Sequence, residues 1–245
     1  MKKVDILAFG AHPDDVELSC GGSIALHVKA GKKVAIVDFT SGELGTRGTP
    51  ELRIKEAEKA GKILGISERE NLNFQDGFFE HNKSNLIEIV KRIRHYKPDL
   101  VLACAEEDRH PDHARASNMI KKACFLAGLE KIKTTYLDIQ QEAWRPSKIL
   151  FYIQSQYLKP QVLIDITDFW EAKINSVLAY ESQFHNPNYK QDEPETFISS
   201  PAFLSFLESR AIHFGQMLGV KYAEGFTSNT EIGIKNFYDL IFNNR

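Results

Sequence analysis

Short apolar runs and segments of helical spacing alternate along the first half of the chain. The apolar runs predict buried strands at residues 4–10, 33–39, 72–74 and 100–104. Apolar residues at helical spacing predict helices at residues 21–30, 50–64, 84–96 and 111–126. Strands that alternate with helices favour βαβ units. We therefore predict an α/β fold, Rossmann-like, with a mostly parallel sheet and helices on both faces.

The second half of the chain is less regular. It contains two apolar runs that predict strands, at residues 148–154 and 162–166, and two predicted helices at residues 167–184 and 201–218. Between these helices lies a loop at residues 185–200, which contains Pro187 and Pro194. A loop of this length inside a compact domain is usually functional or disordered. We favour a lid over the active site, with a subunit contact and plain disorder as the alternatives.

Length and composition restrict the class of protein. The chain has 245 residues, no internal repeat and no long linker, so we predict a single domain over residues 1–245. Its net charge is −2, which indicates neither a nucleic-acid partner nor a membrane surface. Its three cysteines form no CxxC pair, and no apolar run approaches the roughly 18 residues that span a bilayer. Asp5 also falls where a signal peptide would have to be apolar, so we predict a cytoplasmic protein.

Two clusters of histidine and acidic residues follow predicted strands. Residues 12–15 (His-Pro-Asp-Asp) follow the first strand, and residues 108–113 (Asp-Arg-His-Pro-Asp-His) follow the fourth. Ligands bind beyond the carboxyl ends of strands in an open parallel sheet, so the clusters should meet at one edge. A catalytic zinc takes three nitrogen or oxygen ligands and leaves a position for water. His12, Asp15 and His113 would form such a set.

The side chains left over in these clusters suit proton transfer. Asp14 adjoins a ligand and can accept a proton from water, and His110, if protonated, can stabilise an oxyanion. Either residue could then protonate a departing amine. The chain has no G-x-G-x-x-G or phosphate-loop motif, which argues against nucleotide binding.

These motifs resemble those of the LmbE-like, or PIG-L-like, zinc N-deacetylases. The resemblance extends over residues 4–226 and includes residues 21–22, 41–49, 51–53, 108–109, 180–184 and 222–226. It implies one Zn²⁺ per chain, held by His12, Asp15 and His113, although another divalent ion such as Fe²⁺ is possible in the cell. It also implies that Asp14 is the general base and that His110, oriented by Asp112, supports the charged intermediate.

Within this family the chain is most similar to bacillithiol-pathway enzymes that deacetylate N-acetylglucosaminyl-malate to glucosaminyl-malate and acetate. The resemblance implies a small amino-sugar conjugate as the substrate and a homo-oligomer. Arg53 and Arg109 lie near the same edge, and two guanidinium groups suit a dicarboxylate such as malate, though they would also fit a phosphate. Glu43, in the loop at residues 41–49, is a third candidate for substrate binding.

Three other functions remain open at this stage. The enzyme could act on another small N-acetyl sugar or N-acyl conjugate, or the chain could be a non-catalytic, metal-stabilised binding module. A structural metal site is normally closed by four protein ligands and has no use for an unliganded acid such as Asp14 beside it. A metal-dependent phosphoesterase usually needs a second metal and more acidic residues than these clusters contain.

Overall fold

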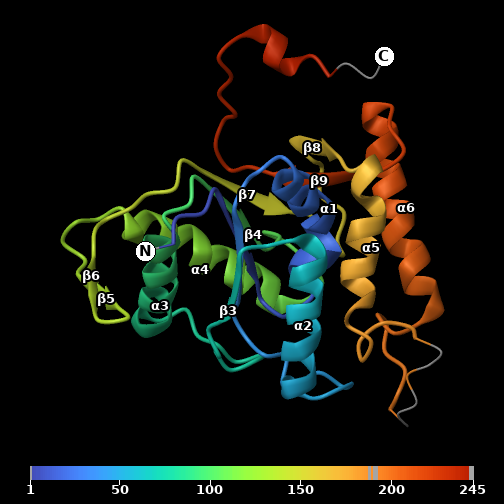
Figure 1. The fold of residues 1–245 in the computed structure, drawn as a ribbon, viewed down its shortest axis with the longest axis horizontal. Helices are drawn as coiled ribbons and strands as arrows, with labels where there is room; N and C mark the ends of the chain where they lie inside the picture. Colours follow the sequence, from blue (N-terminus) through green and yellow to red (C-terminus); the bar gives the residue numbers. More distant parts are fainter. Residues whose placement is uncertain (1, 187–188, 190–192, 243–245) are drawn as a thin grey trace.

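The computed structural model describes residues 2–186, 189 and 193–242 (Figure 1). Its main sheet has seven strands in the order β3-β2-β1-β4-β7-β9-β8. The strands are β1 Ile6–Gly10, β2 Val34–Asp38, β3 Glu68–Asn71, β4 Leu100–Ala103, β7 Lys148–Tyr152, β8 Val162–Asp165 and β9 Ala223–Thr227. Strands β3, β2, β1, β4 and β7 are parallel, and β9 runs antiparallel to both of its neighbours. The prediction of a mostly parallel α/β sheet is confirmed.

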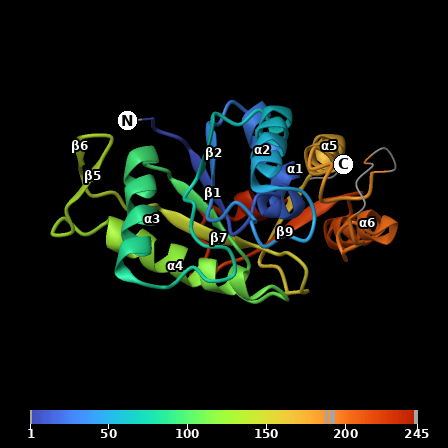
Figure 2. The same cartoon turned by 90° about the horizontal axis from the view of Figure 1, so that it is seen from below.

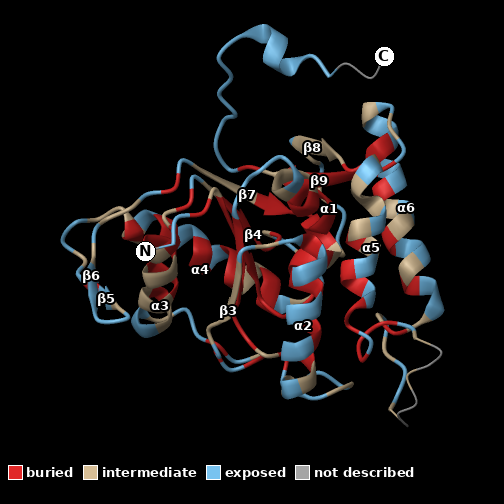
Figure 3. Ribbon diagram, viewed as in Figure 1, coloured by how far each residue is buried: buried red, intermediate tan, exposed pale blue. Residues whose placement is uncertain are grey.

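Helices cover both faces of this sheet, as predicted. They are α1 Asp15–Lys29, α2 Pro50–Leu64, α3 Lys83–Tyr96, α4 Pro111–Ala127, α5 Trp170–Leu178 and α6 Pro201–Leu218. Helices α1, α2 and α5 pack together on one face, and α3 packs with α4 on the other (Figure 2). Helix α6 packs against β9 and β8. The buried residues concentrate on the central strands and the helix faces turned toward them (Figure 3). Within the described residues, no helix has the length and apolarity to cross a membrane.

The predicted bounds of β3 and α5 differ from those in the structure. The strand predicted at residues 72–74 is wrong, because the strand is β3, whose half-buried residues (Glu-Arg-Glu-Asn) pair with β2 at the edge of the sheet. An edge strand needs little apolar side chain, so hydrophobicity did not reveal it. The helix predicted at residues 167–184 is a 3-10 turn, η1 Thr167–Phe169, followed by α5, which ends at Leu178. Beyond Leu178, the backbone amide and the hydroxyl group of Ser182 donate hydrogen bonds to the Glu56 carboxylate, and the chain does not continue as a helix.

Three strands were not predicted. Strands β5 (Thr134–Tyr136) and β6 (Ile139–Gln141) form a separate antiparallel hairpin. Strand β9 lies between β7 and β8, and its sequence (Ala-Glu-Gly-Phe-Thr) contains a buried glutamate and a glycine, which are untypical of strands. This segment is a strand because it pairs with β7 and β8 in the complete sheet, and its own sequence does not indicate one.

Helix α1 begins at Asp15, six residues before the predicted start. It is broken at Cys20, where φ is −139°. The amides freed by the break, those of Gly22 and Ser23, donate to the carboxylate of Glu224 over 3.1 and 2.7 Å. The apolar spacing is therefore regular only beyond the break, and the sequence revealed only that part of the helix.

The other side of the break is held by Lys173. Its ammonium group donates to the carbonyl of Leu18 over 3.0 Å and forms a buried ion pair with Glu224. Gly22 allows α1 to lie close to Ile166, which precedes α5, because a Cβ at Gly22 would lie 2.8–3.0 Å from side-chain atoms of Ile166. Helix α1 is thus fixed at its centre, and its first turn carries Asp15 to the edge of the sheet.

Candidate active site

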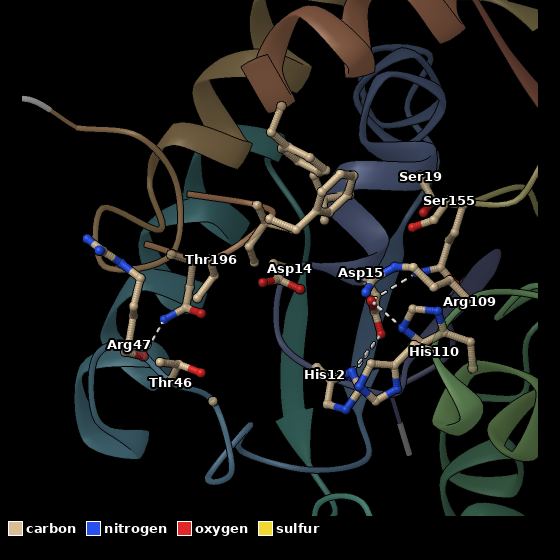
Figure 4. Close-up of a pocket in the computed structure, with 18 of the residues that line it drawn as sticks. His12, Asp14, Asp15, Ser19, Thr46, Arg47, Arg109, His110, Ser155 and Thr196 are labelled. Atoms are coloured by element: carbon tan, nitrogen blue, oxygen red, sulfur yellow. Dashed lines mark hydrogen bonds and ion pairs between the residues drawn. The ribbon is translucent and has the colours of Figure 1, made fainter. Parts of the chain in front are cut away.

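Both histidine clusters line one cavity of about 350 Å³ at the carboxyl ends of β1 and β4 (Figure 4). Seven of the nine residues proposed from the sequence line its wall: His12, Asp14, Asp15, Arg53, Arg109, His110 and His113. Glu43 and Asp112 are not among the residues that line it. The cavity thus brings together the residues expected for metal binding and proton transfer.

His12 and His113 are both fixed through one ring nitrogen and face Asp15 with the other. His12 Nε2 lies 3.0 Å from Asp76 Oδ1, and His113 Nδ1 makes a very short contact with Asp108. The remaining nitrogens, His12 Nδ1 and His113 Nε2, lie 3.5 and 3.1 Å from the two carboxylate oxygens of Asp15. Histidines that bind a metal usually pair their second nitrogen with a carboxylate or carbonyl in this way.

The donor atoms fit a divalent metal, although more than one set is close enough to hold it. Ligand atoms of His12, His110 and His113 lie within 4.8 Å of one another, and so do those of His12, Asp76 and Asp112. The free nitrogens of His12 and His113 nevertheless converge on Asp15, whereas Asp76 already engages the opposite nitrogen of His12. The predicted set, His12, Asp15 and His113, is neither of these two groups, so its role as the ligand set stays a prediction. Asp76 escaped prediction because it lies outside both clusters, 64 residues from His12.

Asp14 occupies an unusual backbone conformation at the start of α1. Its φ of 107° is in the left-handed region, which is rare for a residue with a side chain and is concentrated at functional sites. Arg53 Nη2 donates to Asp14 Oδ2 over 3.0 Å and to the carbonyl of Pro13 over 2.7 Å. Burial raises the pKa of Asp14 to about 7, although Arg53 acts in the opposite direction.

The contacts of Arg53 lie largely within the protein. The residue is buried, and its Nη1 also donates to the carbonyl of Gly42 over 3.3 Å. Gly42 has a φ of +66°, and a Cβ there would lie 1.8 Å from Nη1, so only glycine leaves room for the guanidinium. The Nη atoms of Arg53 are therefore engaged by Asp14 and two backbone carbonyls, whereas its Nε has no hydrogen-bond partner among the described residues and the residue lines the cavity, so its role in substrate binding stays a prediction.

The carboxylate of Glu43 is also used within the protein. Its carboxylate accepts hydrogen bonds from the backbone amides of Asp76 and Ser41, over 2.7 and 3.2 Å. Both oxygens are thus used to join the loop at residues 41–49 to the loop that carries Asp76. Glu43 positions the partner of His12 and does not face the cavity.

His110 and Asp112 contact each other, but not through the carboxylate of Asp112. His110 is the N-cap of α4, and its Nδ1 accepts from the backbone amide of Asp112 over 3.3 Å. Since Nδ1 accepts, the ring is neutral and carries its proton on Nε2. Burial and the neighbouring His12 lower the pKa of His110, which agrees with this state. If His110 were protonated, the condition under which it was predicted to stabilise an oxyanion, Nδ1 could not accept this hydrogen bond.

The carboxylate of Asp112 points elsewhere. It accepts from the amide of Gly77 over 2.9 Å and from Arg115 over 3.0 Å, and it lies 3.5 Å from His12 Nε2. Asp112 therefore orients His110 through its main chain and supports His12 through its side chain.

Arg109 is the exposed cation of the cavity wall. Its guanidinium lies 5.1 Å from the ring centroid of Phe197, and among the described residues it has no carboxylate partner. Phe203, Phe206 and Ile198 add to an apolar wall on this side. These residues come from α6 and the segment before it, and their distance in the sequence from both clusters hid them from the sequence analysis.

The loop expected to act as a lid, residues 185–200, is described only in part. Residues 187–188 and 190–192, which include Asn188 and Lys190, lie outside the described residues. Of the remainder, Thr196, Phe197 and Ile198 line the cavity. Arg47 Nη1 donates to the carbonyls of Glu193 and Pro194 over 3.4 and 3.3 Å. The described end of this loop therefore lies against the cavity.

Comparison with known proteins gives consistent results. The family model PIG-L, described as GlcNAc-PI de-N-acetylase, matches residues 7–124. The conserved protein TT1542 from Thermus thermophilus has a similar structure, with a TM-score of 0.84 and 34% identity over 96% of this chain and 98% of that one. Diacetylchitobiose deacetylase from Thermococcus kodakarensis is 29% identical over 90% of this chain and 81% of its own length. The Bacillus cereus protein named "Probable N-acetyl-alpha-D-glucosaminyl L-malate deacetylase 2" is 28% identical over 73% of this chain and 83% of its own length.

Proposed function

The chain belongs to the PIG-L, or LmbE-like, deacetylase family, and on that premise we propose that it hydrolyses the N-acetyl group of an amino-sugar conjugate with the help of a zinc ion. The observation that carries this proposal is Asp14, a buried carboxylate held by Arg53 beside the convergent nitrogens of His12 and His113. A binding module held together by a metal would not need such a group.

His12, Asp15 and His113 would hold the metal. A bound zinc ion supplies Lewis acidity that eases the deprotonation of water and polarises a carbonyl. Asp76 and Asp108 orient the two histidines, and Asp15 is fixed in turn by the side chain of Gln154, which donates to Oδ1 over 2.9 Å. These contacts prearrange the ligands, so little rearrangement is needed when the metal binds.

The chain's own residues supply the proton transfers. Asp14 accepts a proton from the attacking water, and Arg53 holds its carboxylate in place. His110, with its proton on Nε2, donates a hydrogen bond to the oxygen that becomes negative in the transition state. The reaction forms no bond between enzyme and substrate. Asp14, once protonated, is then positioned to return its proton to the departing amine.

For the substrate we propose N-acetylglucosaminyl-malate, which would yield glucosaminyl-malate and acetate. Arg109 supports this choice, because an exposed guanidinium at the cavity suits a carboxylate. The similarity to the Bacillus cereus protein supports it as well. Diacetylchitobiose is the alternative, favoured by the Thermococcus relative and by the aromatic wall, which could pack against a second sugar.

The loop that carries Phe197 would close over the bound sugar. Thr196 and Phe197 already line the cavity, and closing it would exclude water during the reaction. The chain would act as a homo-oligomer in the cytoplasm, without a nucleic-acid or membrane partner.

A panel of N-acetyl sugars tests the proposal. The zinc-loaded protein is incubated with N-acetylglucosaminyl-malate, diacetylchitobiose and N-acetylglucosamine, and released acetate is measured. We expect kcat/KM to be at least about tenfold higher for the malate conjugate than for diacetylchitobiose, as one charge-assisted contact would give. The reverse order would replace malate by a second sugar. Absence of acetate from every compound in the panel would contradict the proposal of amino-sugar deacetylation.

A further inference from the structure

Arg210, on helix α6, is a cation of the cavity wall that has no carboxylate partner among the described residues. Four arginines line this cavity, namely Arg47, Arg53, Arg109 and Arg210. Arg47 Nε lies 4.0 Å from Glu193 Oε2, and Arg53 pairs with Asp14. Arg210 therefore resembles Arg109, because no acid in the described part of the chain forms an ion pair with either of them.

The guanidinium group of Arg210 is only partly used by the protein. Its Nη1 makes a very short contact with the carbonyl of Gln154, and its Nη2 donates to the carbonyl of Leu18 over 2.7 Å. Its Nε has no hydrogen-bond partner among the described residues and is not enclosed. In the buried Arg94, by contrast, Nε and both Nη atoms donate to main-chain carbonyls. A guanidinium group carries five N–H groups, so Arg210 retains donors for a ligand.

The charges around Arg210 do not balance. Lys173 forms its ion pair with Glu224, and Asp108 is paired with His113. Burial lowers the pKa of Arg210 to about 10, and Glu224 and Asp108, neither of which forms an ion pair with it, oppose this only in part. A buried charge without a partner is costly, so an anion that binds Arg210 would stabilise the charged group.

Only the active-site cavity leaves room for such an anion beside Arg210. A second space lined by this residue, together with Ser19, Lys173 and Glu224, has a volume of about 10 Å³. A volume of about 10–15 Å³ is needed to hold one water molecule, so no carboxylate fits there. The active-site cavity measures about 350 Å³. A carboxylate would therefore reach Arg210 from the active-site cavity.

Ser155 supplies a hydroxyl group close to the same arginine. It follows Gln154, whose carbonyl Arg210 holds, and its own amide donates to Asp108 Oδ1 over 3.1 Å. The Ser155 hydroxyl has no hydrogen-bond partner among the residues that the structure describes and is not enclosed. Figure 4 shows Ser155 on the same side of the cavity as Arg109. A free hydroxyl and two guanidinium groups without a carboxylate partner thus line neighbouring parts of the cavity wall.

We propose that Arg210 and Ser155 form a carboxylate-binding subsite in the active-site cavity, in addition to the contact proposed for Arg109. The guanidinium and the hydroxyl both donate hydrogen bonds, and such bonds to an ionised acceptor are among the strong ones. One positive charge without a partner matches a carboxylate, whereas a phosphate monoester carries about 1.5–2 negative charges.

The identity of the carboxylate rests on the function proposed above. A malyl group carries two carboxylates, of which Arg109 would bind one and Arg210 the other. The acetate that the reaction releases is a second source of the same chemistry. The experiments below separate the two sources.

Binding of small carboxylates to the full-length, zinc-loaded protein tests the subsite without turnover. Isothermal titration calorimetry with L-malate and with acetate gives the dissociation constant of each. We expect Arg210→Gln to raise at least one of these constants at least about tenfold, the effect of losing one charge-assisted contact. Ser155→Ala should raise the same constant about two- to tenfold, as expected for one neutral donor. Unchanged constants for both compounds in either variant would overturn the proposal.

Ser155→Ala also separates binding from folding. It leaves both carbonyl contacts of Arg210 in place, so the subsite is tested even if Arg210→Gln unfolds. The control is Arg145→Gln, because Arg145 also donates to a carbonyl, that of Phe125 over 3.1 Å, but lies outside the cavity. This control should bind both carboxylates like the wild type, and a loss of affinity similar to that of Arg210→Gln would contradict a specific subsite.

Steady-state kinetics then identify the carboxylate. If the malyl group occupies the subsite, Arg210→Gln raises KM for N-acetylglucosaminyl-malate at least about tenfold relative to KM for N-acetylglucosamine. If acetate occupies it, the variant instead raises the inhibition constant of acetate.

The same samples exclude a purely structural role. Arg210 holds Gln154, which in turn holds Asp15, so a supporting role alone would reduce bound zinc and slow both substrates equally. That result would overturn the proposal. Absence of turnover with every sugar would contradict the proposed function instead, and the titration would still decide whether the subsite exists.

Discussion

Arg53 Nη2 lies 3.0 Å from Asp14 Oδ2, and each of these residues is only 5% exposed. The same guanidinium group holds the carbonyl of Pro13, so it fixes both the carboxylate and the backbone that carries it. Asp14 has a positive φ, and backbone strain of that kind persists only where surrounding contacts enforce it. We therefore propose that Arg53 acts mainly on the proposed base.

Replacement of Arg53 should slow the reaction without changing the choice of substrate. Arg53→Ala leaves Asp14 without its partner and with a relaxed backbone, so we expect kcat to fall about 10–100-fold, less than the roughly 10²–10⁴-fold that loss of the acid–base group itself costs. The fall should be equal for N-acetylglucosaminyl-malate and N-acetylglucosamine, as measured by acetate release. A KM that rises only for the malate conjugate would return Arg53 to the substrate site.

Arg109 should have the opposite kinetic signature. Arg109→Ala removes the exposed guanidinium of the cavity, and hydrogen bonds to charged groups contribute about 1.5–3 kcal/mol. We expect KM for the malate conjugate to rise at least about tenfold, with little change for N-acetylglucosamine. Arg145→Ala is the control, because Arg145 is also exposed and lies over a ring, that of Phe125, outside the cavity. Similar effects of both variants would exclude a specific role for Arg109.

The break in α1 depends on a buried ion pair. Glu224→Ala removes the acceptor of the Gly22 and Ser23 amides and leaves the Lys173 ammonium unpaired. Loss of one partner of a buried pair costs about 3–5 kcal/mol, and denaturant unfolding should show this decrease. Glu142→Ala breaks the exposed pair with Lys97 and should hardly change stability. Equal stability of the two variants would contradict this account of α1.

The metal-free protein should lose stability as the pH rises. Burial disfavours the charged form of His113, but Asp15 and Asp108 outweigh this and raise its pKa to about 9. A histidine whose folded pKa lies above its unfolded value of about 6.5 contributes stability that is complete below pH 6.5 and lost as the pH rises through 9. Zinc requires the neutral ring, so its affinity should increase over the same interval.

This pH dependence is measured by urea unfolding between pH 6 and 9.5 in the presence of a chelator, and by competition for zinc over the same range. His113→Gln should flatten both dependences. A wild-type stability that increases over this range would show that His113 is not charged in the metal-free fold.

The elements and site residues that could be predicted are those whose signal lies within a short stretch of the sequence. The apolar runs predicted β1, β2 and β4, and Thr49 followed by Pro50 predicted the start of α2, where Thr49 accepts from the amide of Leu52. The carboxyl ends of parallel strands lie at the same edge of a sheet, which predicted that His12 and His113 lie close together. Both residues line one cavity in the structure. In each case a short segment contains the whole signal.

Contacts between distant segments could not be predicted in this way. Asp76 and Glu224 are single acids in unremarkable surroundings, and their roles come from partners 64 and about 200 residues away. Arg53 was correctly placed near the active site, but only the packed structure shows that its guanidinium faces Asp14. The direction in which a side chain points depends on the residues that surround it in the folded protein.

The central claim is that Asp14 is the general base of a metal-dependent deacetylase. The most direct test measures acetate release and bound zinc in the same samples of the wild type and Asp14→Asn. Asparagine keeps the shape of the side chain but cannot accept the proton, so we predict full zinc content and a fall in kcat of about 10²–10⁴. Near-normal kcat in Asp14→Asn with zinc bound would contradict the account.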